Sequence, residues 1–369
     1  MVNIIQCSKE DFIADVAKGE TELYLFGAGM RCKSVLDNYH LADKVVAIID
    51  NYSARTSYIY TQKTIPIIRL SDLKQGLDIK NKNNIKIFIT PRYQIYDIIE
   101  QLDEDARLNG VSVYIGALMD DFYVKIPFEF TDGPQKIPKK LHYCWFGGTE
   151  IPDHLQKFIN GWHRLCPDYE IFRWDESNYD VKKNEYMMEA YDQKKWGFVP
   201  DFARMDIIYH EGGIYLDTDV ELLKRPDALL NDDFFCGFND NNLLNFGLGF
   251  GAVKHNKLLR NMIEQYHYLH FVNKDGSLNL KACSVYHVPP IVEWGFTLEN
   301  KYQKVNGCVL YPSEVFAPAG GSGLARNYTG NTISCHHSEF SWGSKENKIG
   351  FNRTKKYLPE RLGMRANCF

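Results

Sequence analysis

The sequence predicts an α/β protein of two domains. At 369 residues the chain is longer than a single hydrophobic core usually supports. Short apolar runs alternate with helix-like segments in both halves, which is the pattern of parallel strands joined by helices. A glycine turn follows an apolar run near the start of each half, at residues 27–29 and 147–148.

The first domain is expected to span residues 1–130 and to be built on a Rossmann-like parallel sheet. Its predicted elements run strand, helix, strand, strand, helix, strand over residues 22–29, 30–39, 45–50, 85–90, 92–109 and 111–116. "FGAG" places G-x-G after a strand and Asp50 follows about 20 residues later, as in dinucleotide-binding folds. Cys32 stands where the third glycine belongs. We therefore expect either a nucleotide site or a structural or assembly module.

The second domain is expected to span residues 131–369. The boundary lies in residues 125–140, which are rich in proline and charge and contain an Asp-Gly turn. The last stretch, 344–369, holds seven Lys and Arg against two Glu. It predicts a basic helix or arm that either contacts an anionic membrane surface or packs on the second domain as a solvated helix.

The composition indicates an ordinary globular protein, with 44% hydrophobic and 24% charged residues. A net charge of −4 argues against a dedicated nucleic-acid binder. The nine cysteines are scattered and form no C-x-x-C pair, which favours a reducing compartment over a disulfide framework or zinc site. The start has no signal-peptide pattern and no apolar stretch is long enough to span a membrane. We expect a cytoplasmic protein.

Three acidic residues alternate in "GGIYLDTDVE", directly after the apolar residues 214–216. Asp217, Asp219 and Glu221 would point to the same side of an extended chain, where like charges repel. A cation is the expected partner. The spacing does not fit an EF-hand calcium loop, because Leu222 and Ala228 occupy the positions that need Gly and Glu. The D-x-D pair instead suits Mn²⁺ or Mg²⁺ that keeps positions open for phosphate oxygens.

A helix is predicted directly before this strand. Pro200 suits its first turn, an apolar stripe runs along it, and Gly212 with Gly213 can end it and turn the chain into the strand. Asp201 and Arg204 are three residues apart and share its polar face. The helix, the turn, the strand and the carboxylates are therefore contiguous. This predicts a ligand site at the carboxyl end of a strand.

Several blocks in fixed order resemble a known family. They are "IPKKLHYCWFGG", "CPDYEIFRWDESNYD", "FVPDFARMDIIYHEGGIYLDTDVELLKRPDALL", "VLYPSEVFAP" and "CHHSEFSW". The chain resembles the D-x-D sugar transferases, which include mannosyltransferases of the glycosyltransferase family 32 type, capsular polysaccharide glycosyltransferases of bacteria and, more distantly, the glucosylating clostridial toxins. The resemblance covers about residues 137–342. It implies a GT-A fold, a nucleotide-sugar donor, Mn²⁺ or Mg²⁺, and retention of anomeric configuration.

The resemblance also implies roles for the acidic and basic residues. Asp217 and Asp219 would bind the metal and the ribose or diphosphate, and Asp201 and Arg204 would hold the donor-sugar hydroxyls. His337 would complete the metal site, although His336 is a competing ligand and a structural histidine remains an alternative. Glu221 is expected to be structural.

The remaining carried-over positions would contact the donor. Trp145 would stack on the base, with core packing as the alternative, and Asn245 would contact the donor sugar or the acceptor. Ser341 and Trp342 would close over the diphosphate. The chain departs from the family at Pro289-Pro290, which affects the acceptor-side loop, and at Ser338, which weakens the metal assignment of His337.

These observations predict a metal-dependent, retaining glycosyltransferase that acts on a glycan, glycolipid or polysaccharide acceptor of the bacterial surface type. No carboxylate is spaced as a nucleophile, so same-face attack with the departing phosphate as base is favoured. One alternative is a non-catalytic scaffold that binds a nucleotide sugar. Another is a bifunctional enzyme with NAD-dependent sugar chemistry in the first domain, but no Tyr-x-x-x-Lys pair is placed for hydride transfer there.

Overall fold

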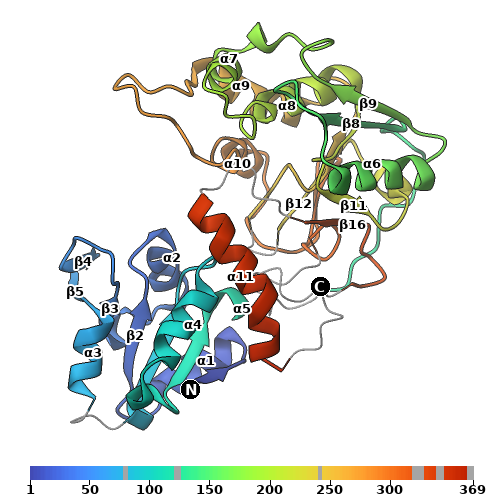
Figure 1. The fold of residues 1–369 in the computed structure, drawn as a ribbon. Coiled ribbons are helices and arrows are strands. Elements are labelled where there is room, and N and C mark those ends of the chain that lie inside the picture. The colour runs from blue at the N-terminus through green and yellow to red at the C-terminus, as the bar shows by residue number, and fades with distance from the viewer. Residues whose placement is uncertain (78–81, 120–125, 240–242, 318–327, 338–344, 364–369) are drawn as a thin grey trace. The chain divides into compact units, whose positions relative to one another are not determined.

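The computed structural model describes residues 1–77, 82–119, 126–239, 243–317, 328–337 and 345–363 (Figure 1). These residues form two seven-stranded sheets, a two-stranded sheet and the helices that cover them. The predicted α/β class is confirmed. The chain divides into two compact units: the first joins residues 1–123 to the C-terminal stretch from 343, and the second holds most of residues 124–342.

The first unit is built on a nearly parallel sheet of strand order β1-β7-β6-β2-β3-β5-β4. Only the edge pair of β4 and β5 is antiparallel among the pairings of this sheet. Its elements are β1 (Asn3–Ile5), α1 (Lys9–Ala17), β2 (Glu22–Phe26), α2 (Met30–Tyr39), η1 (Ala42–Lys44), β3 (Val45–Ile49), β4 (Ser57–Tyr60), β5 (Lys63–Ile68), α3 (Leu70–Gly76), η2 (Lys82–Asn84), β6 (Ile85–Ile89), α4 (Ile95–Asp103), η3 (Ala106–Leu108), β7 (Ser112–Ile115), α5 (Gly116–Met119) and α11 (Lys345–Arg361).

The glycine turn after β2 is packed tightly against neighbouring residues and held by hydrogen bonds to Asp50. A Cβ atom on Gly27 would lie 2.6 Å from the Pro91 ring, so close packing against the end of β6 requires glycine there. The Asp50 carboxylate accepts from the backbone N–H groups of Ala28 at 2.9 Å, Tyr52 at 3.0 Å and Ser53 at 2.9 Å. Both of its oxygens therefore help to fix the turn.

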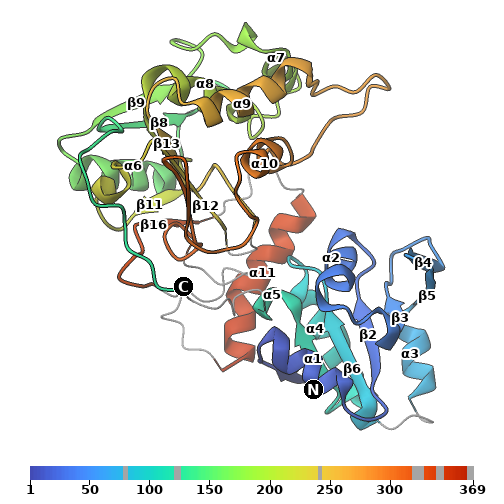
Figure 2. The ribbon, with the colours of Figure 1, turned by 180° about the vertical axis from the view of Figure 1, so that it is seen from behind.

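The C-terminal helix corrects the expected domain division, because α11 packs in the first unit and not in the second. Leu358 is fully buried in the core beneath α4. Arg353 forms ion pairs with Asp97 and Glu100, and Arg361 donates to the backbone oxygen of Val2 at 2.9 Å. Figures 1 and 2 show α11 alongside α4 from both sides.

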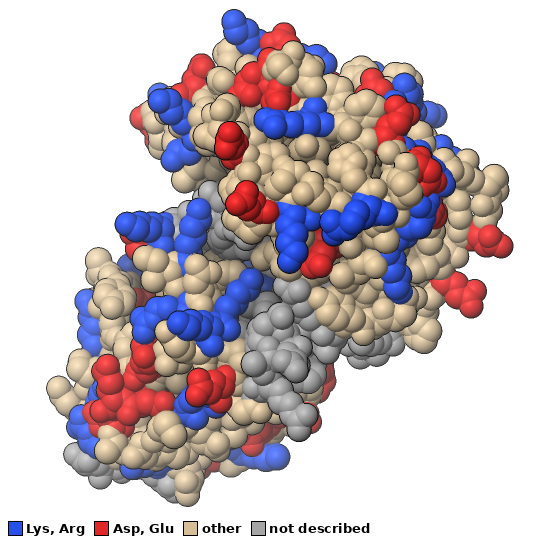
Figure 3. All heavy atoms as spheres, turned by 45° about the vertical axis from the view of Figure 1, so that its right-hand side comes forward, with Lys and Arg blue, Asp and Glu red and all other residues tan. Residues whose placement is uncertain are grey.

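This packing gives no support to the expected membrane contact of the basic tail. Phe351 is buried against Tyr93, with ring centroids 5.7 Å apart, so the apolar face of α11 is used inside the protein. On the face drawn in Figure 3, Lys and Arg are interspersed with Asp and Glu over both units. Among the described residues, none of the helices is both long and apolar enough to cross a bilayer.

The second unit contains a mixed sheet of order β14-β15-β12-β13-β10-β8-β9 and a small sheet of β11 and β16. Its elements are β8 (Lys140–Cys144), α6 (Asp153–Leu165), β9 (Glu170–Trp174), η4 (Val181–Lys183), α7 (Glu185–Asp192), α8 (Pro200–Glu211), β10 (Gly213–Tyr215), β11 (Val220–Leu222), η5 (Pro226–Leu229), β12 (Phe234–Gly237), β13 (Phe250–Ala252), α9 (Lys257–Glu264), η6 (Gln265–Tyr268), α10 (Ser284–Glu293), β14 (Gln303–Val305), β15 (Cys308–Tyr311) and β16 (Ser334–His336).

Strand β10 is an interior strand of the seven-stranded sheet of this unit. It pairs in parallel with β8, where Ile214 is opposite Leu141, and antiparallel with β13. Alternation along the strand sends Tyr215 into one core cluster, whereas Ile214 and Leu216 enter the cluster on the other face of the sheet. Because side chains on both faces of β10 are buried, the strand is held firmly and the position of Asp217, which follows it, is fixed.

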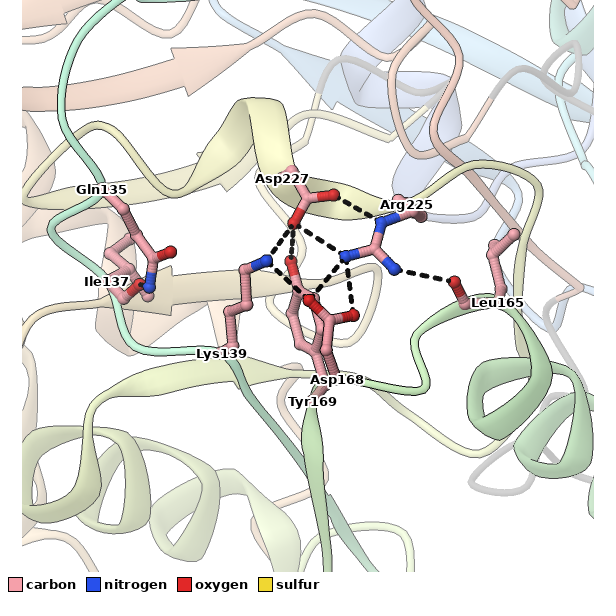
Figure 4. A network of polar contacts seen from close by, with 8 residues as sticks. All are labelled: Gln135, Ile137, Lys139, Leu165, Asp168, Tyr169, Arg225 and Asp227. Atoms are coloured by element: carbon pink, nitrogen blue, oxygen red, sulfur yellow. Dashed lines mark hydrogen bonds and ion pairs between the residues drawn. The ribbon is translucent and has the colours of Figure 1, made fainter.

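An ionic network fixes the amino end of β8 (Figure 4). Lys139 contacts Asp168 at 2.7 Å and Asp227 at 3.3 Å, while Arg225 contacts Asp168 at 2.7 Å and Asp227 at 2.6 Å. The Tyr169 hydroxyl also donates to Asp227 at 2.9 Å. The network ties the start of β8 to the loop after α6 and to the start of η5.

We predict that Leu358→Ala destabilises the first unit by about 2–5 kcal/mol, because a large side chain leaves a cavity in a closed core. Lys356→Ala, an exposed neighbour on the same helix, is the control and should change little. Thermal unfolding of the full chain measures both. Equal and small effects of the two substitutions would contradict the placement of α11 in this core.

The network predicts a pH dependence of stability. Hydrogen bonds from Lys139 and Arg225 lower the pKa of Asp168 to about 2, below its usual value. A lowered folded-state pKa gives stability that is present above the unfolded pKa and lost as pH falls from about 4 to about 2. Asp168→Asn should therefore lose less stability than the wild type across this window in urea unfolding, whereas the exposed Asp192→Asn should behave like the wild type.

Candidate functional site

The site is assembled by the junction of α8 and β10. Pro200 occupies the first turn of α8, and Gly212 ends the helix with φ of 64°. Gly213 has φ of 103°, and a Cβ atom there would lie 2.8 Å from the backbone oxygen of Lys140. The two glycines therefore allow the chain to turn tightly from α8 into β10 against β8, as the sequence predicted.

Asp217 follows the end of β10 and is held on one carboxylate oxygen. Its Oδ1 accepts from the Tyr215 hydroxyl at 3.0 Å and lies 3.6 Å from Arg204 Nη2. The Arg204 guanidinium also lies over the Tyr215 ring, 5.2 Å from its centroid. The backbone N–H of Asp217 donates to the Gly247 oxygen at 3.2 Å. Side chain and backbone are thus both fixed.

Asp201 and Arg204 form a buried ion pair, as expected from their spacing. Arg204 Nη2 lies 3.2 Å from Asp201 Oδ1, and each residue is 5% exposed. Burial raises the pKa of Asp201 to about 7, against the opposing effect of Arg204. Burial alone would lower the pKa of Arg204, but Asp217, Tyr215 and Asp201 raise it. The guanidinium therefore remains charged and links two carboxylates.

Asp217, Asp219 and His336 converge on one point. One ligand atom from each lies within 4.8 Å of the other two, and His336 Nε2 is 3.3 Å from Asp219 Oδ1. Val220 of β11 is opposite His336 of β16, so this strand pairing brings the distant histidine to the D-x-D turn. Burial raises the pKa of Asp217; Arg204 opposes this rise and Asp219 adds to it. Two carboxylates and one imidazole are a donor set that Mn²⁺ accepts.

The structure places His336, and not the expected His337, beside Asp219. His337 turns to the other side, where its Nε2 lies 2.9 Å from Glu221 Oε2 and its ring stacks on Phe158 at 4.5 Å. Successive residues of an extended chain point to opposite faces, so His336 and His337 cannot both face Asp219. Glu221 has the structural role expected for it, because it holds His337.

The other predicted positions have different outcomes. Trp145 follows β8 and is half-buried, and its indole N–H donates to the Thr149 oxygen at 2.8 Å. Asn245 is beside the site, since its Oδ1 accepts at 2.8 Å from the N–H of Gly247, the residue that binds the Asp217 backbone. Ser341 and Trp342 lie outside the described residues.

Sequence reasoning missed Tyr215 and Gly247. Tyr215 is two residues before Asp217 and so shares its side of the strand, which was a usable signal. Gly247 stands in "NFGLGFG", where nothing in the sequence distinguishes a glycine that packs on a carboxylate from one that makes a turn.

Comparison with known proteins gives one family match. Residues 152–235 match the family described as a glycosyltransferase sugar-binding region containing the DXD motif. This segment includes Asp201, Arg204, Asp217 and Asp219 but not His336.

Curated relatives match over part of the chain. The chain is 27% identical over 151 residues to mannosyl phosphorylinositol ceramide synthase SUR1 of Saccharomyces cerevisiae, which covers 40% of this chain and 37% of the relative. It is 31% identical over 116 residues to inositol phosphoceramide mannosyltransferase 1 of Schizosaccharomyces pombe, covering 27% and 34%. The chain thus spans about a third of the length of these relatives.

Two solved structures show only low similarity. The PaToxG glycosyltransferase has a TM-score of 0.32 and 17% identity, covering 36% of this chain and 60% of that one. A glycosyltransferase involved in the glycosylation of the major capsid of PBCV-1 has a TM-score of 0.33 and 8% identity, covering 58% and 100%.

The two adjacent histidines provide a matched test of the cation site. We predict that His336→Ala weakens Mn²⁺ binding by about tenfold or more, since loss of even an indirect metal partner costs this much. His337→Ala should leave Mn²⁺ affinity unchanged and lower the unfolding temperature, because it removes the Glu221 bond and the Phe158 stack. Calorimetric titration with Mn²⁺ measures both, and the reverse pattern would restore His337 as the ligand.

Proposed function

Because residues 152–235 match the family described as a glycosyltransferase sugar-binding region containing the DXD motif, we propose that this chain is a metal-dependent glycosyltransferase. It would move a sugar from a nucleotide-sugar donor to an acceptor hydroxyl. The observation that carries the proposal is the convergence of Asp217, Asp219 and His336 beside the buried Asp201–Arg204 pair. Such a site offers a place for a cation and, next to it, fixed polar groups for a sugar.

Asp217, Asp219 and His336 would hold Mn²⁺ or Mg²⁺. When bound, the cation would neutralise the diphosphate and stabilise the charge that develops on it as the sugar departs. The three protein groups lie close enough to share one ion, and the burial that raises the pKa of Asp217 is what a cation would offset.

Arg204 and Asp201 would orient the donor sugar. Arg204 is held by Asp201, by Asp217 and by the Pro200 backbone oxygen at 3.1 Å, so its position is fixed before any donor binds. A sugar that is already held in place would present its anomeric carbon to the acceptor hydroxyl, so less entropy would be lost in bringing the reacting groups together. Trp145, half-buried after β8, would stack on the base.

For the stereochemistry we propose retention by same-face attack. The carboxylates nearest the expected sugar are already engaged, Asp201 with Arg204 and Asp217 with Tyr215 and Arg204. Neither is placed as a free nucleophile for a double displacement. The departing phosphate would then take the proton of the acceptor hydroxyl.

The sugar and acceptor are proposed from the names of the relatives. Both relatives are named for mannose transfer to inositol phosphoceramide or for its product. We therefore propose a nucleotide-activated mannose as the first donor and an anionic glycolipid as the first acceptor to test. A glycan or polysaccharide of the bacterial surface type is the second acceptor class.

The competing functions make different predictions. A non-catalytic scaffold would bind the nucleotide sugar and never hydrolyse it, yet Asp201, Arg204, Asp217 and Asp219 are all present and in contact or convergent. A bifunctional enzyme with NAD chemistry in the first unit is disfavoured, because no Tyr-x-x-x-Lys pair is placed for hydride transfer there.

We predict that the full chain hydrolyses one member of a nucleotide-sugar panel in Mn²⁺ and stops in excess EDTA. Asp217→Asn should lower turnover by about 100-fold or more, the usual cost of removing a group that stabilises transition-state charge. Unfolding curves of wild type and variant should superpose. Full turnover in EDTA would remove the metal from the mechanism, and donor binding without any turnover would favour the scaffold.

Arg204→Ala and Trp145→Ala should separate sugar contacts from base contacts. We predict that Arg204→Ala lowers turnover far more than it weakens binding of the free nucleoside diphosphate. Trp145→Ala should weaken nucleotide binding by about 1–3 kcal/mol, the usual contribution of base stacking. Calorimetry with the nucleoside diphosphate distinguishes them, and a swapped pattern would refute the two placements.

A further inference from the structure

Gly247 has no room for a side chain because the Asp217 carboxylate occupies that space. A Cβ atom on Gly247 would lie 2.2 Å from Asp217 Oδ2 and 3.1 Å from its Cγ. Gly247 does not have a positive φ, so its backbone conformation would accept other residues. The requirement for glycine at this position is therefore one of space.

Asp217 has little freedom to move out of the way. Its Oδ1 is held by the Tyr215 hydroxyl at 3.0 Å and faces Arg204 at 3.6 Å. Its backbone N–H is bound to the Gly247 oxygen at 3.2 Å. A side chain on residue 247 could be accommodated only by rotating the carboxylate, which would break these contacts and turn Oδ2 away from its present place.

The segment that carries Gly247 is itself fixed. The Gly247 N–H donates to Asn245 Oδ1 at 2.8 Å, and the Asn245 N–H donates to the Gly237 oxygen at 3.2 Å. Gly237 is the last residue of β12 in the seven-stranded sheet of the second unit. The distance between Gly247 and Asp217 is thus set by the sheet on both sides and not by a loose loop.

We propose that Gly247 is a positioning residue for the cation site. Its missing side chain leaves the space in which Asp217 Oδ2 is held, while Tyr215 and Arg204 engage Oδ1. Because Oδ1 is engaged, Oδ2 would be the oxygen that Asp217 offers to a divalent cation, and Asp219 and His336 would supply the other ligands. The cation in this inference rests on the proposed function, whereas the steric relation between Gly247 and Asp217 does not.

The first experiment measures Mn²⁺ affinity of the full chain by calorimetry. Gly247→Ala should bind Mn²⁺ about tenfold or more weakly than the wild type, because it displaces the carboxylate. The control is Gly161→Ala on α6, where the nearest atom to an added Cβ is 3.8 Å away. Equal Mn²⁺ affinity of Gly247→Ala and the wild type would overturn the proposal.

The second experiment removes the metal and asks whether the clash is with the carboxylate. Gly247→Ala is introduced into the wild type and into Asp217→Ala, and unfolding temperatures are compared in EDTA. Most of the stability that Gly247→Ala loses in the wild type should be regained in the Asp217→Ala background, where the carboxylate is gone and Asn245 Oδ1, 3.2 Å from the added Cβ, is the remaining close atom. An undiminished loss there would show that the carboxylate is not the group that excludes a side chain, and it would overturn the proposal.

The two readouts separate this inference from the proposed function. A wild-type chain that binds no Mn²⁺ would remove metal dependence, and the stability comparison alone would then decide the role of Gly247. In that case, a Gly247→Ala variant as stable as the wild type would overturn the positioning role as well. Should Gly247→Ala fail to fold, recovery in the double variant would support it.

Discussion

The buried guanidinium of Arg204 is the group on which the rest of the site depends. Asp201 lies in the first turn of α8 and Asp217 follows the end of β10, and burial disfavours the charged form of each. Arg204 contacts both, at 3.2 and 3.6 Å. Without a shared cation, two carboxylates so close in a dry environment would repel each other. The arginine allows them to be neighbours.

The same charges explain why the site suits a divalent cation. Asp201, Asp217 and Asp219 contribute three carboxylates against the one guanidinium, so an excess of negative charge remains when all are ionised. His336 adds a neutral ligand nitrogen when it is unprotonated. A bound cation would remove the excess and attract the phosphates of a nucleotide. The proposed metal dependence therefore rests on an excess of negative charge that the fold gathers in a buried site.

The two-unit organisation has a consequence for the whole chain. The first unit is completed by α11, with Leu358 inside its core, so the second unit is inserted between the start and the end of the first. A fragment that begins near residue 135 would retain the site but leave the buried face of α11 without its partner. The C-terminal helix belongs to a core whose other elements lie more than 200 residues earlier in the sequence. Burial of its apolar side chains, Leu358 among them, holds the helix in that core.

Much of the site could be predicted because its determinants are close together in the sequence. Residues 200–219 contain a helix start, a double-glycine stop, a short apolar strand and the D-x-D pair, and the structure keeps that order. The spacing of three between Asp201 and Arg204 already implied their contact, since such residues share a helix face. The α/β class followed from the alternation of apolar runs and helices in the same way.

Only the tertiary structure decided which residues distant in the sequence contribute to the site and to each core. The pairing of β11 with β16 selects His336 over its neighbour, because a register shift of one residue would exchange the two faces. Packing on α4 assigns α11 to the first unit, and the approach of residues 245–247 to Asp217 places the Asp217 carboxylate where a side chain on Gly247 would lie. The sequence by itself determined the local elements and their chemistry, since periodicity and spacing act within a few residues. Which distant residues complete them depends on strand register and core packing, which no local pattern encodes.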